Sequence, residues 1–275
     1  MQVTNGCSWN RCTFCEMYTQ PQKRFNVKPQ QKIEQELAAI AESRVPVRRI
    51  FLADGDAMTL SSRRLKLIMQ AIKRYLPDVQ RVSSYCLPRN LKNKTVGELA
   101  ELNELGLKLF YVGCESGDNL VLERVNKGEN FDTSLAALQK IKAAGSKSSV
   151  MILNGMGGKR YSQQHAVNSA RLMNQAQPEY LSTLVVSFPA GTDRYQAAFK
   201  GEFEPLDQAG LFREMYCLLE SLELDDTIFR SDHASNYLVL KGNLNRDKDR
   251  MLQTVREALE RPGAVNLRPE WMRGL

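Results

Sequence analysis

Histidine is scarce in this sequence of 275 residues, which has only His165 and His233. His165 lies within a predicted helix and is expected to be structural. The chain shows no Ser/His/Asp triad, no paired-histidine zinc motif and no phosphate-binding P-loop. No apolar run approaches the roughly 20 residues of a membrane-spanning helix, and no charged and apolar leader opens the chain. We therefore expect a cytoplasmic protein without a membrane partner, in a compartment where thiols stay reduced.

The composition is that of an ordinary folded domain, with 43% hydrophobic and 25% charged residues. A chain of this length can form a single α/β barrel. The formal charge of +7 would suit an anionic partner such as RNA, a phosphate or a carboxylate-rich molecule. Lysine and arginine are scattered along the chain without a concentrated block, so a solvated basic surface is the simpler explanation.

Three of the six cysteines lie in one short loop, at Cys7, Cys12 and Cys15. Three thiolates this close in the chain can hold three irons of a [4Fe-4S] cluster and leave the fourth iron open to a chelating small molecule. Two other uses of the loop stay open here: a zinc site made by Cys12, Cys15 and two later ligands, or buried structural thiols. The other three cysteines are too dispersed to predict a second cluster.

Short apolar strands that end in turns recur along the first two thirds of the chain. After the end of a first strand at 1–4, we predict strands at 49–53, 81–86, 107–112, 149–153 and 180–187. Segments between them predict helices at 30–43, 60–75, 95–105, 132–144 and 162–175, and one that ends at Asn126. This alternation is typical of right-handed βαβ units. The sequence therefore predicts an α/β fold, a partial (β/α)6 TIM-type barrel with its functional residues at the carboxyl ends of the strands.

The alternation stops near Pro189, so we predict a core barrel at residues 1–190 and a C-terminal α/β extension at 191–275. The expected elements beyond the barrel are a loop at 190–206, helices at 207–222 and 247–259, and an extended stretch at 234–241. Because six strands leave a lateral gap in a barrel, we expect the extension to pack on the core and cover its mouth. We also expect the natural chain to extend before Met1, since a barrel strand normally has about 5 residues or more.

The cysteine loop resembles that of the radical S-adenosylmethionine (SAM) enzymes, which usually reads C-x3-C-x2-C with an aromatic residue before the last cysteine. Phe14 has this aromatic position, while the spacing between Cys7 and Cys12 is one residue longer. The later turns resemble the same family, in the same order, over about residues 3–190. The resemblance implies that Cys7, Cys12 and Cys15 bind a [4Fe-4S] cluster and that Phe14 belongs to the cofactor site.

Two turns and one lysine carry residues that the resemblance assigns to SAM. Asp54-Gly55-Asp56 stands where the family commonly has Gly-Gly-Glu, so Gly55 and Asp56 are expected at the SAM ammonium group. The turn around Glu115 resembles the branch that includes oxygen-independent coproporphyrinogen oxidase, methylthiotransferases and the Elongator catalytic subunit, where this position lies beside SAM. Lys127 is a candidate partner of the SAM carboxylate. Taken alone, these residues also fit an ordinary turn and a solvated lysine.

The remaining candidates follow later strands. In the glycine-rich turn at 154–158, missing side chains would let the backbone approach the adenine. The other cofactor candidates are Ser84, Gly155 and Val186. The substrate candidates, which leave the third strand or follow the last loop, are Arg89, His233 and Asn236.

By this resemblance the chain is expected to be a radical SAM enzyme, in which reductive cleavage of SAM yields a 5′-deoxyadenosyl radical that abstracts hydrogen from a substrate. It would need an external one-electron donor such as flavodoxin or ferredoxin. Because the sequence has no block of basic residues, a small anionic substrate is favoured, and an RNA-modifying enzyme of the same family is the alternative. Two interpretations from other classes stay open: a zinc-stabilised binding module and an iron-sulfur electron-transfer protein, which would need a fourth cluster ligand.

Overall fold

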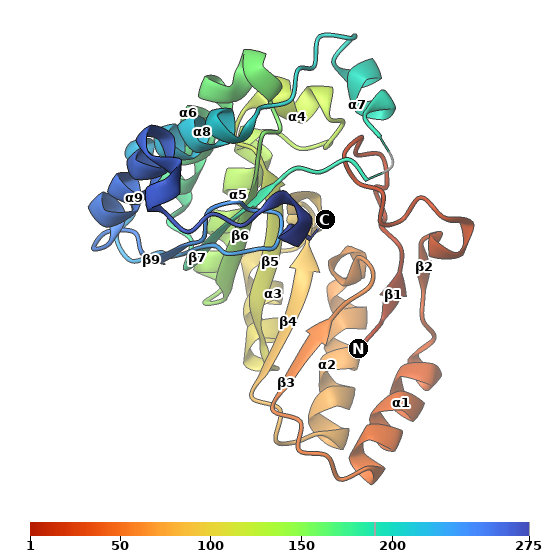
Figure 1. The fold of residues 1–275 in the computed structure, drawn as a ribbon. Coiled ribbons are helices and arrows are strands. Elements are labelled where there is room, and N and C mark those ends of the chain that lie inside the picture. The colour runs from red at the N-terminus through yellow and green to blue at the C-terminus, as the bar shows by residue number, and fades with distance from the viewer. Residues whose placement is uncertain (190, 275) are drawn as a thin grey trace. The chain divides into compact units, whose positions relative to one another are not determined.

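The computed structural model describes residues 1–189 and 191–274 (Figure 1). The chain divides into two compact units. The first unit comprises Met1–Asn10, Met17–Gly113 and Ala136–Ser148, and the second comprises Arg11–Glu16, Cys114–Leu135 and Ser149–Leu275. The predicted boundary at Ala190 lies outside the described residues, and the division into a core and an extension stays a prediction.

The main sheet has seven strands among the described residues, in the order β3-β4-β5-β6-β7-β8-β9. Their bounds are β3 (Arg49–Leu52), β4 (Arg81–Cys86), β5 (Leu107–Glu115), β6 (Lys147–Asn154), β7 (Tyr180–Val185), β8 (Ile228–Ser231) and β9 (Leu240–Asn243). The pairs β3-β4, β4-β5, β6-β7 and β7-β8 are parallel, whereas β8-β9 is antiparallel. The predicted α/β fold, a partial barrel of the TIM type, is confirmed.

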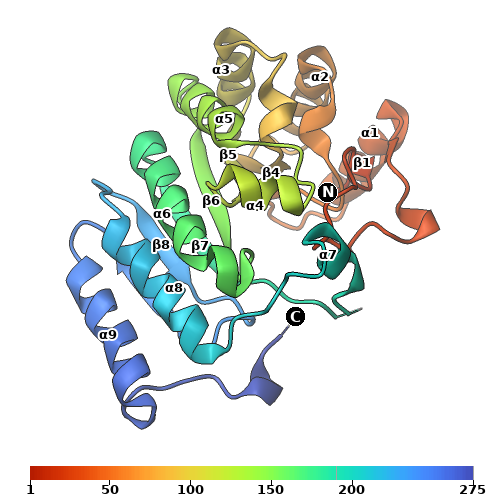
Figure 2. The ribbon, with the colours of Figure 1, turned by 90° about the horizontal axis from the view of Figure 1, so that it is seen from above.

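The helices of the first unit follow from their sequence pattern. They are α1 (Gln30–Glu42), α2 (Ser62–Tyr75) and α3 (Val96–Glu104), and they pack in the succession α1, α2, α3 (Figure 2). Along α2, apolar side chains three or four positions apart are buried, including Leu65, Ile68 and Ile72. The segments that precede α2 and α3 begin where β3 and β4 end.

In the second unit, α6 (Gly158–Ala176), α8 (Gln208–Ser221) and α9 (Lys248–Glu260) lie side by side, with α8 in the middle (Figure 2). Two short helices, α4 (Asn119–Arg124) and α7 (Asp193–Ala198), complete this unit, and α5 (Phe131–Ala143) has residues in both units. None of the described helices combines the length and apolar character needed to cross a membrane.

Several short elements were not expected from the sequence. The predicted loop at 190–206 contains α7, and the stretch before the predicted extended segment contains β8. Both are short, so the apolar periodicity that identifies longer elements is weak in them. The segment 17–30 likewise contains a 3-10 turn, η1 (Pro21–Lys23), and the short strand β2 (Asn26–Val27).

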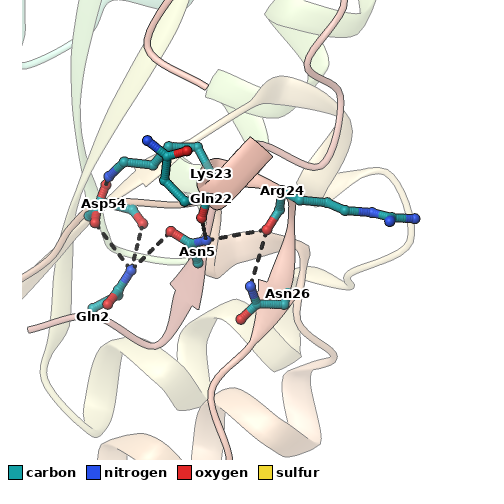
Figure 3. Close-up of polar contacts among 7 residues, drawn as sticks. All are labelled: Gln2, Asn5, Gln22, Lys23, Arg24, Asn26 and Asp54. Carbon is teal, nitrogen blue, oxygen red and sulfur yellow. Dashed lines mark hydrogen bonds and ion pairs between the residues drawn. The ribbon is translucent and has the colours of Figure 1, made fainter. Parts of the chain in front are cut away.

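The two chain segments that flank the cysteine loop are tied together within the first unit. Strand β1 (Thr4–Asn5), which includes the end of the predicted first strand, pairs antiparallel with β2 (Asn26–Val27). The Asn5 side-chain amide donates to the carbonyl oxygens of Gln22 at 2.8 Å and Arg24 at 3.3 Å (Figure 3). The chain segments before and after the cysteine loop are therefore held side by side within the first unit.

The turn after β3 is bound to the same two segments through Asp54. Its carboxylate accepts a hydrogen bond from Gln2 Nε2 at 3.1 Å and pairs with Lys23 Nζ at 2.7 Å (Figure 3). Asp54 has a φ of 56°, a left-handed conformation that short polar residues tolerate better than most. These contacts place the base of the cysteine loop beside the turn that carries Gly55 and Asp56.

Close approach of two backbones requires glycine at this base. Gly6 and Gly55 form a parallel β-bridge. A Cβ atom on Gly55 would lie 2.4 Å from the Thr4 carbonyl oxygen, and one on Gly6 would lie 2.0 Å from that of Lys23. Because the obstructing atoms belong to backbone, neither contact can be relieved by a side-chain rotation.

We predict that Gly55→Ala lowers the free energy of unfolding by about 1–3 kcal/mol, because the added methyl group collides with the Thr4 carbonyl. Urea unfolding of the two proteins measures this change. Gly263→Ala is the control, since a Cβ atom there meets nothing within 4 Å. Equal unfolding midpoints for the Gly55→Ala and Gly263→Ala proteins would show that the close approach at Gly55 is not required.

Candidate functional site

Among the candidate site residues of the first unit, Asp56 carries a buried carboxylate, and only 4% of the residue's surface is exposed. Its Oδ2 atom accepts a short hydrogen bond from the Ser8 hydroxyl and a longer one, at 3.4 Å, from the Asn90 amide. Ser8 directly follows Cys7, and Asn90 lies in the 3-10 turn η3 (Pro88–Leu91) after β4. One carboxylate thus connects the cysteine loop with the ends of two neighbouring parallel strands.

Cys7 is half-buried, and its sulfur accepts a hydrogen bond from the Asn10 backbone N–H, with 3.4 Å between nitrogen and sulfur. The Asn10 side chain donates to the Tyr18 carbonyl oxygen at 2.9 Å. Hydrogen bonds to cysteine sulfur stabilise negative charge on it and tune clusters that bind there. The first unit therefore supplies both a thiol and a donor directed at its sulfur.

Arg89 and Ser84, the other first-unit candidates, follow or belong to β4. The guanidinium carbon of Arg89 lies 3.6 Å from the centre of the Trp9 ring, a cation–π contact with the cysteine loop. Ser84 is fully buried, and its hydroxyl donates to the Tyr85 carbonyl oxygen at 2.8 Å. The Ser84 donor is thus engaged within its own strand.

Residues 11–16, which carry the other two cysteines, belong to the second unit and are bound to the segment after α4. The Thr13 backbone N–H donates to the Val125 carbonyl at 3.0 Å, and the Asn126 side chain donates to the Arg11 carbonyl at 3.2 Å. Because the loop has no secondary structure of its own here, these hydrogen bonds determine its backbone path.

Arg194 in α7 binds the two cysteines of this segment through their backbone. Its guanidinium donates to the carbonyl oxygens of Cys12 at 3.1 Å and Cys15 at 3.4 Å. A planar guanidinium can hold two acceptors at once, which a lysine ammonium does with less geometric restraint. The contact orients the peptide groups of both cysteines while leaving their sulfur atoms outside the interaction.

Phe14 packs against a hydrophobic cluster of the second unit, which includes Met156, Tyr195 of α7 and Phe199, the residue after α7. The rings of Tyr195 and Phe199 are stacked at 4.9 Å. The Tyr195 hydroxyl donates to the Met156 carbonyl at 2.6 Å, and burial raises the pKa of Tyr195, so the phenol stays a neutral donor. Helix α7 therefore connects the cysteine segment with the glycine turn after β6.

Glu115 and Lys127 form a buried ion pair, with 2.9 Å between Nζ and Oε1 and only 11% and 4% of their side chains exposed. Burial disfavours the Lys127 ammonium, but the acidic groups of Glu115 and Cys12 outweigh burial and raise the pKa of Lys127. The lysine therefore stays charged at neutral pH. Its ammonium also lies 5.8 Å from the centre of the Phe14 ring, next to the cysteine segment.

Gly155 has a φ of +83° at the end of β6, and its backbone N–H donates to Glu214 Oε1 at 2.6 Å. The other carboxylate oxygen of Glu214 accepts a hydrogen bond from the Ser162 hydroxyl, also at 2.6 Å. Glu214 is 2% exposed, so this carboxylate is held by protein donors. Buried His165 lies between Ser116, at 2.7 Å, and Glu214, at 3.9 Å.

The loop with His233 and Asn236 is bound to the end of β7, close to Val186. The Asn236 amide donates to the Thr183 carbonyl at 2.8 Å, and the Ser235 hydroxyl accepts from the Val185 N–H at 3.1 Å. His233 is exposed, and its Nδ1 contacts Ser235. The Val186 N–H donates to the Asn154 carbonyl, so a ligand would meet the Val186 carbonyl or side chain.

The structure thus brings the sequence-predicted residues together in groups within each unit. The first unit holds Cys7, Gly55, Asp56, Ser84 and Arg89. The second unit holds Cys12, Phe14, Cys15, Glu115, Lys127, Gly155, Val186, His233 and Asn236. Four further residues that hold these candidates were missed: Ser8, Asn90, Arg194 and Glu214. Only Glu214 had a signal in the sequence, because an acid lies on the apolar stripe of its helix between Leu211 and Leu218.

The donor set fits an iron-sulfur cluster. Cys7, Cys12 and Cys15 are half-buried thiols, soft ligands that suit iron-sulfur clusters, and one of them already accepts a backbone N–H. The loop passes from the first unit into the second and back, and among the described residues no three His, Cys, Asp or Glu side chains are gathered as a ready metal site. The fit therefore rests on the chemistry of the three thiols.

The sequence matches the model of a known protein family. A family model described as the radical SAM superfamily matches residues 1–173. A search of curated proteins found no match. The chain is similar in fold to coproporphyrinogen III oxidase from Escherichia coli, with a TM-score of 0.59 and 16% identity over 80% of this chain and 51% of that chain.

Two other solved structures are similar in fold. One is the archaeal Methanocaldococcus infernus Elp3, with a TM-score of 0.51 and 15% identity over 88% of this chain and 61% of that chain. The other is the radical SAM methyltransferase TsrM from Kitasatospora setae. It has a TM-score of 0.52 and 17% identity over 66% of this chain and 35% of that chain. The chain spans 35% of the length of TsrM and 51% of the length of the coproporphyrinogen oxidase. Identities this low show a shared fold alone.

We predict that Glu115→Ala lowers the free energy of unfolding by about 3–5 kcal/mol, because it leaves the Lys127 ammonium buried without its partner. The Glu115→Ala/Lys127→Met protein should lose much less than the sum of the two single changes. Urea unfolding of the four proteins in this cycle measures the coupling. Glu204→Ala, which breaks an exposed pair with Lys159, is the control and should cost at most about 1 kcal/mol. Additive losses in the cycle would show that the buried pair is not coupled.

We also predict that Glu214→Gln loosens the glycine turn after β6. The amide keeps one acceptor oxygen but presents N–H groups where the carboxylate accepted from Gly155 and Ser162, so the free energy of unfolding should fall by about 1–3 kcal/mol. Hydrogen exchange of the Gly155 amide should also accelerate. Glu220→Gln, the same change at an exposed position of α8, is the control. An equally protected Gly155 amide in both variants would contradict this role of Glu214.

Proposed function

Because the chain belongs to the radical SAM superfamily and is an enzyme of that class, we propose that it cleaves SAM reductively and directs the resulting 5′-deoxyadenosyl radical at a small anionic substrate. The radical SAM superfamily predicted from the sequence is confirmed by the family model. Coproporphyrinogen III oxidase and Elp3 are similar to the chain in fold. The cofactors are a [4Fe-4S] cluster and SAM. The observation that carries the proposal is the set of three thiols in one loop, within the matched residues.

Cys7, Cys12 and Cys15 would hold the cluster. When bound and reduced, a [4Fe-4S] cluster supplies the electron that breaks a carbon–sulfur bond of SAM. The chain's own contribution is to hold the three thiols: Arg194 orients the Cys12 and Cys15 peptides, and the Asn10 N–H stabilises charge on the Cys7 sulfur. An external one-electron donor, a flavodoxin or ferredoxin, would reduce the cluster, and we place the protein in the cytoplasm.

The residues assigned to SAM match its charges. The Asp56 carboxylate, held by Ser8 and Asn90, would accept hydrogen bonds from the ammonium group of the methionine part. Lys127 stays charged and has three N–H donors, of which Glu115 takes one, so it would pair with the SAM carboxylate. Glu115 would then orient Lys127 while contacting SAM itself.

Two further positions are assigned to the nucleoside part of SAM. Gly155 and Val186 lie at the ends of β6 and β7, where Gly155 lacks a side chain and Val186 has its N–H engaged with Asn154. They would border the adenine, and Phe14 would pack beside the cofactors. We also propose that Ser84 contacts SAM and that His233 and Asn236 contact the substrate.

Anaerobic reconstitution followed by dithionite and SAM tests the proposed function, with 5′-deoxyadenosine as the expected product. The Cys12→Ala protein should lose bound iron and sulfide and form no 5′-deoxyadenosine, because two thiols cannot hold the cluster in place. Cys217→Ala, a half-buried cysteine outside the loop, is the control and should keep both.

A colourless protein that binds zinc instead would favour the binding-module interpretation. A brown protein that takes up electrons but releases no 5′-deoxyadenosine would favour an electron carrier. Iron and sulfide content unchanged in Cys12→Ala would show that the cluster assignment is wrong.

A further inference from the structure

Three aromatic rings lie together on one face of the sheet in the first unit. Phe51 belongs to β3, Tyr85 to β4 and Tyr111 to β5, which are neighbouring strands. The ring centre of Phe51 lies 4.8 Å from that of Tyr85 and 5.1 Å from that of Tyr111. The two tyrosine rings are 6.3 Å apart. These are distances of rings in direct contact, so the three side chains form one surface, the aromatic patch.

The aromatic patch is open, although it lies in the interior of a parallel sheet. Tyr85 is 42% exposed, and Phe51 and Tyr111 are half-buried. Side chains alternate between the two faces of a strand, and on the opposite face Ile50 and Val82 are buried. Helices α2 and α3 lie on that side of the strands (Figure 2). Because parallel sheets are normally covered on both faces, an exposed ring on an internal strand is expected where a ligand covers it.

Two arginines lie on the same face as the aromatic patch, at the amino ends of β3 and β4. Arg49 and Arg81 are direct partners in the parallel register. Each stands an even number of positions before the aromatic residue of its strand, so alternation places both on this face. The Nε atom of Arg81 is buried and has no hydrogen-bond partner among the described residues. A buried donor without an acceptor is costly, and an oxyanion would satisfy it.

The rings and the charges together select the class of ligand. Three tilted rings suit stacking and edge-to-face contacts with a further ring, and the two tyrosines add hydroxyl groups. Aromatic surfaces also bind cations, but the two arginines would repel a cation. An aliphatic chain would pack on the rings without the additional attraction between aromatic groups. The combination therefore favours an aromatic ring that carries a carboxylate or phosphate group.

The length of the face fits a small molecule. A strand rises by about 3.3 Å per residue, so the four positions from Arg81 to Tyr85 span roughly 13 Å. Tyr85 immediately precedes the last residue of β4, and Asn90, shortly after this strand, donates to Asp56 at 3.4 Å. The aromatic patch is therefore at the carboxyl ends of the strands, where SAM is proposed to bind. An acid bound along this face would present its ring toward SAM and its anionic group away from it.

We propose that the aromatic patch binds the ring of an aromatic or heteroaromatic acid, with Arg49 and Arg81 binding its carboxylate or phosphate group. This acid is the substrate of the proposed radical reaction, so the inference rests on the proposed function for that role, but not for the binding itself. It narrows the small anionic substrate to one in which a short chain joins a planar ring to the anionic group. Carboxylate and phosphate share the same recognition chemistry, and the experiment separates them.

Isothermal titration of the reconstituted holoprotein with four probes tests the aromatic patch. The probes are indole-3-propionate, 2-naphthyl phosphate, 3-cyclohexylpropionate and tryptamine. At least one of the two aromatic anions should bind saturably at one site per chain, and the tighter of them identifies the preferred anionic group. The aliphatic acid lacks ring contacts and the amine has the wrong charge, so both should bind at least about tenfold more weakly.

Substitutions on the proposed face should weaken binding of the tighter aromatic anion. Tyr85→Ala should weaken it roughly tenfold, because it removes the most exposed ring, and Tyr85→Phe, which keeps the ring, should stay within about threefold. Arg49→Gln removes a charged donor at an exposed position and should also weaken it roughly tenfold. The matched controls are Tyr75→Ala and Arg63→Gln, the same changes on α2, and both should bind within about twofold of the natural protein.

Four results would overturn the proposal: no saturable binding of either aromatic anion, equal binding of 3-cyclohexylpropionate, equal binding of tryptamine, or variants that bind as their controls do. A dimer that sediments as such in the natural protein but not in Tyr85→Ala, together with no binding of the probes, would overturn it in favour of an interface between two copies of the chain. Formation of 5′-deoxyadenosine is measured separately. SAM cleavage without binding of an aromatic anion refutes the aromatic patch alone, and binding without SAM cleavage refutes the proposed function alone.

Discussion

The hydrogen bonds from Arg194 to the carbonyl oxygens of Cys12 and Cys15 are the contact on which the second unit's part of the site depends. The segment that carries these cysteines has no helix or strand of its own, so its shape must come from partners elsewhere in the chain. Arg194 belongs to α7, whose next residue, Tyr195, binds the Met156 carbonyl in the glycine turn. A helix of six residues therefore joins the metal-ligating segment to the proposed nucleoside site.

In the first unit, the equivalent restraint is the approach of two backbones at Gly6 and Gly55 together with the buried Asp56 carboxylate. The glycines let Cys7 start directly beside the turn after β3. Asp56 then binds the residue after Cys7 as well as Asn90 after β4. Both arrangements hold the cysteines through backbone and neighbouring groups, and the sulfur atoms are left for the metal.

Buried charge is concentrated where function is proposed. Desolvation of the Glu115–Lys127 pair costs free energy that a hydrophobic pair would not cost. The role of the ion pair is therefore to keep a charged lysine in a buried position. Lys94 and Glu214 are also buried charged residues. The Lys94 ammonium donates to backbone carbonyls, and the Glu214 carboxylate accepts from an N–H and a hydroxyl. Each stabilises a turn at a strand end, which is where a parallel α/β sheet binds its ligands.

The sequence by itself determined the alternation of strands and helices and the sulfur chemistry of the loop, because periodicity is local and Cys7, Cys12 and Cys15 are neighbours along the chain in any fold. It missed α7 and β8, which are too short to show a period. Only the tertiary structure decided the partners of the candidate residues: Lys127 with Glu115, Gly155 with Glu214, and the cysteine carbonyls with Arg194. Up to 182 positions separate these partners, and only chain folding brings such distant groups within hydrogen-bonding distance.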